Sequence, residues 1–425
     1  MAAAASVALL GCAHPNPEEQ HYQDAARIEP PAEGEARANK LVLHASDLVR
    51  TIPPSQDAAP HYLKAFSLLE GAGIDKAAGS ASTLELKNAP ELRALLSKAA
   101  PALAEIEAAC KAPHCDLKRD FGKGFGLTFP ELPKFELSSR LLCARAYMNA
   151  ASGDYASAGA DIGRVGQMIK HLVEQPTISD ALTCVAMESN ASESIQRIVS
   201  DAHGRQECAK AMLAGMARFP VVLDPRAMVP QEIVMAYETI KPSTLFDKGD
   251  EAITSKSDGK RTVKDVVASV HNIDQSLALA AWKTRAIKYY VGLLTAGAGE
   301  TLSVHGLNER FDNITDMEMA ADHTHDLNRI FNANDKDAWN AMLKYDAVSE
   351  VTLLGLAHLA TPEAVDLAGI ASRPDPFTDK PLQAATKPGG FVLYSVGEDG
   401  DDPKPGSKLP PNAISFEYPY APGGK

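Results

Sequence analysis

The sequence predicts an all-α protein that ends in a small β-hairpin. Apolar residues recur at spacings of three and four over much of the chain, as expected for amphipathic helices. No proline occurs between Pro242 and Pro362, whereas 11 of the 28 prolines lie from Pro362 onward. Proline breaks helices because it lacks the backbone N–H, so the middle of the chain permits long helices and the end does not.

Helical periodicity begins near residue 38. The segments 91–110 and 135–155 each place their apolar residues on one face, and a third helix begins at Ser179 and Asp180. The stripe of the first segment consists of Leu92, Leu95, Leu96, Ala99, Leu103, Ile106 and Cys110. These stripes predict helices that pack through their apolar faces.

Residues 141–170, "LLCARAYMNAASGDYASAGADIGRVGQMIK", resemble a tetratricopeptide-type helical hairpin. The turn is Gly-Asp-Tyr at 153–155, and small Ala158 follows it, which implies a tight turn and close helix backbones. The first helix departs from the family, since Arg145 and Ala146 replace its aromatic residue and glycine. Without a second copy at a fixed period, the body is either an array of degenerate hairpins or an irregular α bundle.

The tail from residue 373 to 425 changes character. Gly389-Gly390 and the apolar run from Phe391 to Val396 predict a β-hairpin. This stretch resembles the C-terminal hairpin of major pseudopilins from type II secretion, which implies a calcium loop. The matching ligands would be Ser395, Asp399, Asp401 and Asp402. The alternative is an exposed acidic turn without metal, because the long N-terminal helix of a pilin is missing.

The first residues suggest export. Residues 2–10 are apolar but far shorter than the roughly 20 residues that span a bilayer. Leu9-Leu10-Gly11-Cys12 resembles the bacterial lipobox, which implies a covalent lipid (diacylglycerol and an acyl chain such as palmitate) on Cys12. Ala13 rather than aspartate follows, which implies the outer membrane. No Lys or Arg precedes the apolar run, and a buried segment with a free cysteine is the alternative.

These patterns divide the chain into four parts. The expected organisation is a lipoprotein signal peptide (1–11), a flexible tether (12–37), an α-helical domain (38–372) and a tail rich in proline and glycine (373–425). The net charge of −13 disfavours nucleic acid as a partner, and 45% hydrophobic residues are ordinary for a globular protein. The same negative charge disfavours an anionic membrane surface, so membrane contact is expected through the lipid.

Cysteines and one polar cluster are the remaining candidates for chemistry. Cys110 and Cys115 flank a short loop and are close enough in sequence to form a disulfide in an oxidising envelope, or they are small buried residues. In a helix, Glu318, Asp322 and His325 would lie within one turn-width of each other, with Asp326 adjacent, and Asp322 and His325 have the spacing of a metal-binding pair. The alternative for this cluster is a solvated polar face beside a core stripe.

No catalytic signature accompanies these candidates. The sequence has neither a G-x-S-x-G turn nor a P-loop, so no residue is assigned a catalytic role and no cofactor besides the lipid is expected. The function predicted first is a lipid-anchored module that binds or scaffolds a protein or peptide partner. The alternatives are a metal-dependent enzyme that uses residues 318–326 and a component of a secretion system.

Overall fold

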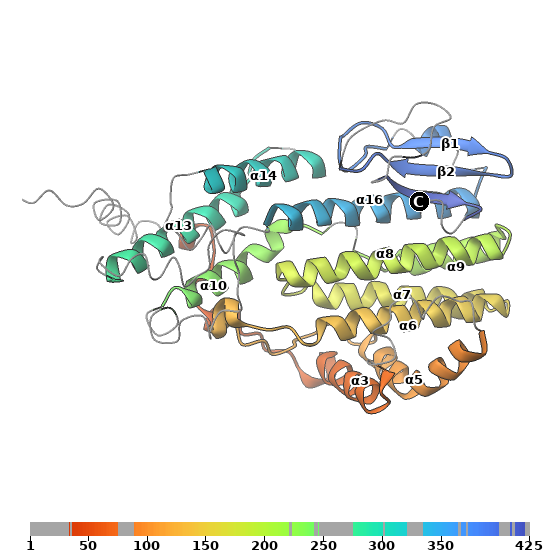
Figure 1. Cartoon of the computed structure of the whole chain (residues 1–425), viewed down its shortest axis with the longest axis horizontal. Coiled ribbons are helices and arrows are strands. Elements are labelled where there is room, and N and C mark those ends of the chain that lie inside the picture. The colour runs from red at the N-terminus through yellow and green to blue at the C-terminus, as the bar shows by residue number, and fades with distance from the viewer. Residues whose placement is uncertain are drawn as a thin grey trace, which may run out of the picture.

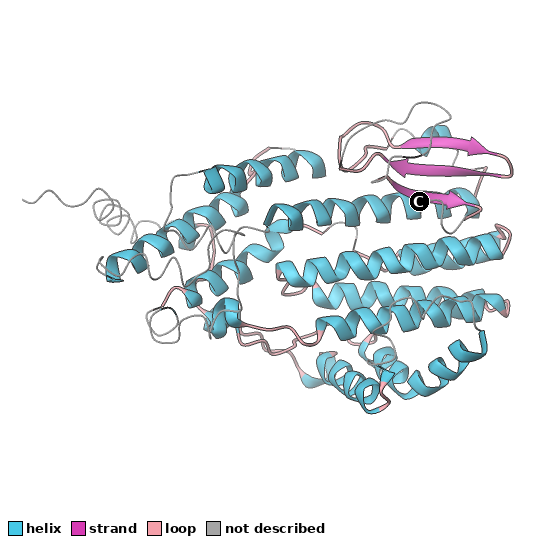
Figure 2. Ribbon diagram, viewed as in Figure 1, coloured by secondary structure: helices cyan, strands magenta, loops and turns pink. Residues whose placement is uncertain are grey.

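The computed structural model describes residues 34, 36–74, 89–220, 223–241, 245, 275–300, 302–320, 335–363, 367–370, 373–398, 409 and 413–420. The principal helices are α3 (Ala59–Gly71), α5 (Ala89–Ala109), α6 (Leu132–Ala151), α7 (Tyr155–Leu172), α8 (Ile178–Asp201), α9 (Gln206–Met216), α10 (Val229–Thr239), α13 (Gln275–Thr295), α14 (Val304–Ala320), α16 (Asp335–Ala360) and α17 (Leu367–Ile370). The strands are β1 (Gln383–Lys387), β2 (Gly390–Ser395) and β3 (Ile414–Tyr418). The predicted all-α body with a small C-terminal β structure is confirmed (Figure 2).

Helical hairpins form the body of the protein. Figure 1 shows the pairs α3/α5, α6/α7 and α8/α9 lying on one another, followed by α16 and then by the sheet. Within the stack, α6 packs against α8 and α7 packs against α9. The helices α10, α13 and α14 lie at one end of this stack (Figure 1). The part from α3 to α9 is therefore a hairpin array.

The hairpin of α6 and α7 forms where the sequence predicts it. After α6 ends, Gly153 has a φ of +86°, which glycine adopts without strain. The Asp154 side chain then caps α7 by accepting a hydrogen bond of 3.0 Å from the backbone N–H of Ser157. Ala158 is completely buried. The turn is therefore formed by a glycine with positive φ, an aspartate cap and a buried alanine.

The α7–α9 contact depends on glycine. A Cβ on Gly159 would lie 2.3 Å from the carbonyl oxygen of Ala211, and one on Gly215 would lie 2.5 Å from the carbonyl oxygen of Gly159. Further along α7, a Cβ on Gly163 would lie 2.9 Å from the Arg218 side chain, and one on Gly166 would lie 2.9 Å from the Arg218 backbone. Only residues without a side chain permit backbones this close, so shape determines the register of the two helices.

A three-stranded antiparallel sheet covers α16. The strands follow the order β1-β2-β3, and the β1–β2 hairpin turns at Pro388 and Gly389, as the glycine pair predicts. The third strand, β3, was not expected. It places the buried ring of Phe416 on α16, where a Cβ on Gly355 would lie 2.2 Å from the ring. The sheet thus packs on the helical body where the Phe416 ring contacts Gly355.

The predicted signal peptide and most of the predicted tether lie in residues 1–33, outside the described residues. Among the helices that are described, none is both long and apolar enough to cross a membrane.

Candidate functional site

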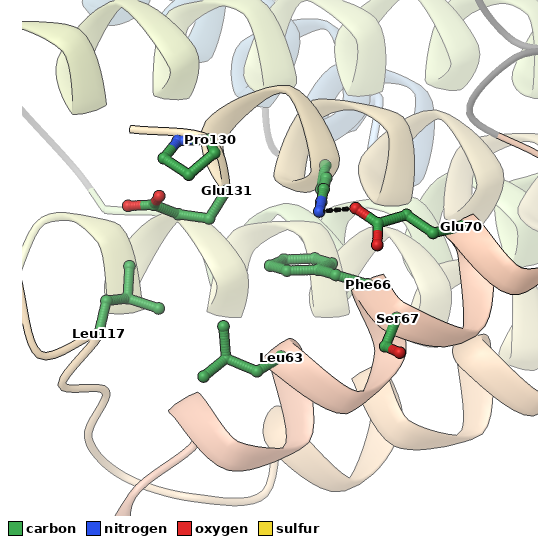
Figure 3. A pocket seen from close by; sticks show the side chains of 8 residues that line it. Leu63, Phe66, Ser67, Glu70, Leu117, Pro130 and Glu131 are labelled. Carbon is green, nitrogen blue, oxygen red and sulfur yellow. Dashed lines mark hydrogen bonds and ion pairs between the residues drawn. The ribbon is translucent and has the colours of Figure 1, made fainter. Parts of the chain in front are cut away.

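A small groove opens between α3 and the beginning of α6. α3 contributes Leu63, Phe66, Ser67 and Glu70, the loop before α6 contributes Leu117, Pro130 and Glu131, and α6 contributes Lys134. In Figure 3 the side chains of Leu63, Phe66 and Leu117 point toward one another. The volume of the groove is about 190 Å³. It is therefore smaller than a typical pocket for drug-sized molecules, at roughly 300–1,000 Å³, and suits a single apolar side chain.

The floor of the groove is rigid. Phe66 is buried and its ring meets that of Phe135 edge-on, with centroids 5.1 Å apart, while the Tyr62 ring lies 4.8 Å from Phe135. Tyr62 Oη lies 2.8 Å from His171 Nδ1, and His171 Nε2 lies 3.0 Å from the carbonyl oxygen of Ala112. Burial lowers the pKa of His171, so the neutral ring donates from Nε2 and accepts the Tyr62 hydroxyl at Nδ1.

Charged side chains border the groove in pairs. Glu70 of α3 forms an ion pair with Lys134 of α6 (Figure 3). Glu131 accepts a hydrogen bond of 2.8 Å from Arg119 Nε, and the same guanidinium binds both oxygens of Asp180 at 2.5 and 2.7 Å. Asp180 is completely buried and also belongs to the capping box that begins α8. Arg119 thus connects the border of the groove to the beginning of α8.

Leu63 is the most exposed of the large apolar side chains in the groove, which are Leu63, Phe66 and Leu117. Its exposed fraction is 53%, whereas the Phe66 ring beside it is 3% exposed. An exposed leucine over a buried aromatic floor, bordered by ion-paired groups, has the chemistry of an anchor pocket in a protein interface.

The predicted metal cluster falls largely outside the described residues. Asp322, His325 and Asp326 lie there, and Glu318 belongs to α14 without a described side chain. Of the proposed calcium ligands, Asp399, Asp401 and Asp402 also lie outside the described residues. Within the described part of the chain, no group of three or more His, Cys, Asp or Glu residues is placed to hold a metal ion.

Ser395, the remaining calcium candidate, has a structural contact. Its buried hydroxyl donates to Asp375 Oδ1 at 2.9 Å and accepts from the N–H of Gly397 at 3.2 Å. The other oxygen of Asp375 accepts the N–H of Val396 at 2.9 Å. The Asp375-Pro376 turn is therefore bound to the end of β2 through the hydroxyl that the resemblance assigns to calcium.

The predicted disulfide between Cys110 and Cys115 is not formed. Both are free thiols, as are the other described cysteines. Cys110 Sγ donates to the carbonyl oxygen of Arg164 at 3.6 Å and lies 3.9 Å from Tyr62 Oη, so its hydrogen-bonding partners lie in the core. Burial raises the pKa of Cys110 to about 11 and raises that of Cys115 as well. Both thiols stay neutral; Cys115 is buried, as the alternative expects, whereas Cys110 is half-buried.

The sequence interpretation missed the groove. Leu63 and Phe66 have the spacing of a helical core stripe, and nothing in the sequence separates the exposed one from the buried one. The pairing of Arg119 with Asp180 joins residues 61 positions apart, which no local pattern reveals. The one local signal that could have located this border is the pair Pro130 and Pro133, which marks where α6 begins.

Comparison with known proteins adds no relative. No protein-family model matches the sequence, and no significant match was found to a curated protein or to a solved structure.

Proposed function

We propose that this protein is a non-catalytic binding module, anchored by lipid in the cell envelope, that takes one apolar side chain of a partner protein into the α3–α6 groove. The observation that carries the proposal is the half-exposed Leu63 above the buried ring of Phe66, bordered by ion pairs. A partner side chain placed there removes apolar surface from water, which contributes roughly 25 cal/mol per Å².

The border supports recognition of a peptide chain. Glu70 and Glu131 lie beside the apolar floor, and each has a cationic partner, Lys134 and Arg119 respectively. Ion pairs at the edge of an interface add little affinity but select the charges and orientation of the partner. Because α3 and α6 are held by the core, the groove exists before binding, which lowers the entropic cost of recognition.

Peptide selection tests the groove. Immobilised protein should enrich, from a random peptide library, sequences with a recurring apolar residue. We expect Leu63→Glu to weaken binding of the selected peptides at least tenfold, because it places a charge over the apolar floor. Leu68→Glu is the matched control, since Leu68 is on the same helix, is 36% exposed and does not line the groove.

Two outcomes would contradict this proposal. One is a library that yields no enriched peptide, and the other is a set of peptides that bind Leu63→Glu as tightly as the unchanged protein. Circular dichroism of both variants verifies that the helical fold is retained.

The envelope location rests on the lipobox-like residues around Cys12. Cells given labelled palmitate should incorporate it into the unchanged protein and not into Cys12→Ser, and the unchanged protein should fractionate with the outer membrane. Incorporation that is equal in both proteins would refute lipidation at Cys12. The metal-enzyme and secretion-system alternatives stay predictions, tested by metal analysis and by a pull-down from solubilised envelopes.

A further inference from the structure

The C-terminal strand is held by α8 as an extended ligand would be. Among the described residues, β3 is at the edge of the sheet, because the order β1-β2-β3 gives it β2 as its one strand partner. Its other edge faces α8. There, Gln196 Nε2 donates to the carbonyl oxygen of Ser415 at 3.3 Å, and Gln196 Oε1 accepts the N–H of Glu417 at 2.9 Å. One side-chain amide thus satisfies two backbone groups of an otherwise open strand edge.

The contacts continue along the same face of α8. The N–H of Tyr420 donates to Ser200 Oγ at 2.6 Å, and the Tyr420 hydroxyl donates to Glu193 Oε1 at 3.1 Å. The Arg197 guanidinium lies 5.7 Å from the centre of the Tyr420 ring. These four helix residues follow the spacing of one helix face. Two of them, Gln196 and Ser200, bind backbone atoms, which are the same in every extended segment.

Side-chain selectivity comes from two places. The ring of Phe416 occupies a notch at Gly355 of α16, where a Cβ would lie only 2.2 Å from the ring. Four residues later, Tyr420 lies against Glu193 and Arg197. An aromatic residue followed at the fourth position by tyrosine therefore matches both places. Between them, the Tyr418 side chain lies against Gly204, where a Cβ would be 2.5 Å from its hydroxyl.

The connection to β3 is long for a hairpin. Ser395 pairs with Ile414, yet residues 396–413 separate them in the sequence, whereas a hairpin needs roughly two to five residues. Such a length closes the sheet with little restriction on where β3 lies, since loop-closure entropy grows slowly with length.

We propose that α8 and Gly355 form a binding site for extended segments of other proteins, and that residues 414–420 occupy this site in cis and compete with them. The site is separate from the α3–α6 groove. Its ligand is an extended peptide that carries an aromatic residue for the glycine notch and a tyrosine four residues later. Because the segment belongs to the same chain, it competes intramolecularly, so the site is uncovered only when the segment is weakened or outcompeted.

The test uses the full-length protein and a fluorescein-labelled peptide with the sequence of residues 412–422. We expect the peptide to bind Phe416→Ala at least tenfold more tightly than the unchanged protein, because the variant's own strand has lost its anchor. Adding Gln196→Ala to Phe416→Ala should weaken peptide binding at least tenfold. Gln206→Ala, an exposed glutamine at the start of α9, is the matched control and should change nothing.

A second variant tests the proposal even if Phe416→Ala fails to fold. Tyr420→Ala removes the partly exposed tyrosine and leaves Phe416 in place, and it should also bind the peptide more tightly than the unchanged protein. Fluorescence anisotropy measures binding, and circular dichroism verifies the helices. Peptide binding that is no tighter to either variant, or that does not depend on Gln196, overturns the proposal. Leu63→Glu should leave this binding unchanged, which separates its outcome from that of the groove.

Discussion

Two interfaces of the same helical stack are built by opposite means. Between α7 and α9, glycines let the backbones approach until carbonyl oxygens lie where a Cβ would be. Between α8 and α16, polar and ionisable side chains are buried instead, among them Glu188 and Asp346. The comparison shows that one interface depends on shape and is indifferent to pH, whereas the other depends on protons and hydrogen bonds.

Each of the two buried carboxyl groups between α8 and α16 has hydrogen-bond partners on only one of its oxygens among the described residues. Ser349 Oγ donates to Glu188 Oε1 at 3.2 Å, and the N–H of Leu223 donates to Asp346 Oδ1 at 3.3 Å. The second oxygen of each carboxyl group has no hydrogen-bond partner among the described residues. Burial raises the pKa of Asp346 to about 8 and raises that of Glu188 well above its usual range. Asp346 is therefore mainly protonated at neutral pH, and Glu188 keeps its proton to a higher pH than an exposed glutamate does.

The largest expected effect breaks the interface that depends on shape. In Gly159→Ala the new Cβ would lie 2.3 Å from the carbonyl oxygen of Ala211, and a backbone atom cannot rotate away. We expect the free energy of unfolding to fall by about 3 kcal/mol, equally at pH 5 and pH 8. Urea unfolding followed by circular dichroism at both pH values measures it.

Gly71→Ala is the matched control for this substitution. Gly71 ends α3, and nothing lies within 4 Å of the position of its Cβ. Alanine there should stabilise the protein by up to about 1 kcal/mol, because it restricts the unfolded chain. A Gly159→Ala protein as stable as Gly71→Ala would show that α7 and α9 can separate without cost.

The turns within hairpins and the contacts between helices also differ in how far the sequence predicts them. The α6–α7 hairpin was predictable because Gly153 and Asp154 signal the turn within a few residues. The α8–α9 hairpin turns through His203 and Gly204, both with positive φ, but lacks the tyrosine and alanine that follow the α6–α7 turn, so its likeness to that hairpin was missed. Glu188 gave no signal, since burial of a carboxyl group depends on α16, far away in the sequence.

The tail and the groove show the same difference between local features, which the sequence predicts, and long-range contacts, which it does not. The β1–β2 hairpin follows from a local glycine turn, whereas β3 joins through a long-range pairing that no short pattern encodes. The groove depends on which side of α3 the loop at Leu117 leaves uncovered. The residues of a local turn can be recognised in a single sequence, whereas contacts between distant segments cannot.

A smaller effect, opposite in sign, sharpens the role of protons. The pKa of Asp346 rises from an ordinary 3.8 to about 8, with Asp224 and Glu350 adding to the effect of burial. The folded protein then keeps a proton that the unfolded chain releases, so stability falls as pH rises from about 4 to about 8. Asp346→Asn is neutral at every pH and keeps an oxygen for the Leu223 N–H.

We expect Asp346→Asn to be more stable than the unchanged protein by a few kcal/mol at pH 8 and to differ little at pH 4. Urea titrations across this pH range measure the difference, with Gly159→Ala as the variant whose deficit stays constant. A stability gain that is the same at pH 4 and pH 8 would refute a raised pKa for Asp346.

The smallest effect isolates one hydrogen bond of the α8–α16 interface. Ser192 and Thr352 are buried with their hydroxyl groups bonded to each other. Ser192→Ala leaves the Thr352 hydroxyl without this partner and should cost about 1 kcal/mol, whereas adding Thr352→Val removes both polar groups and should recover most of that loss. A double-mutant cycle by urea unfolding measures the coupling. If the two losses simply add, the hydroxyl pair does not stabilise the interface, and the buried carboxyl groups alone distinguish it from the glycine contact of α7 and α9.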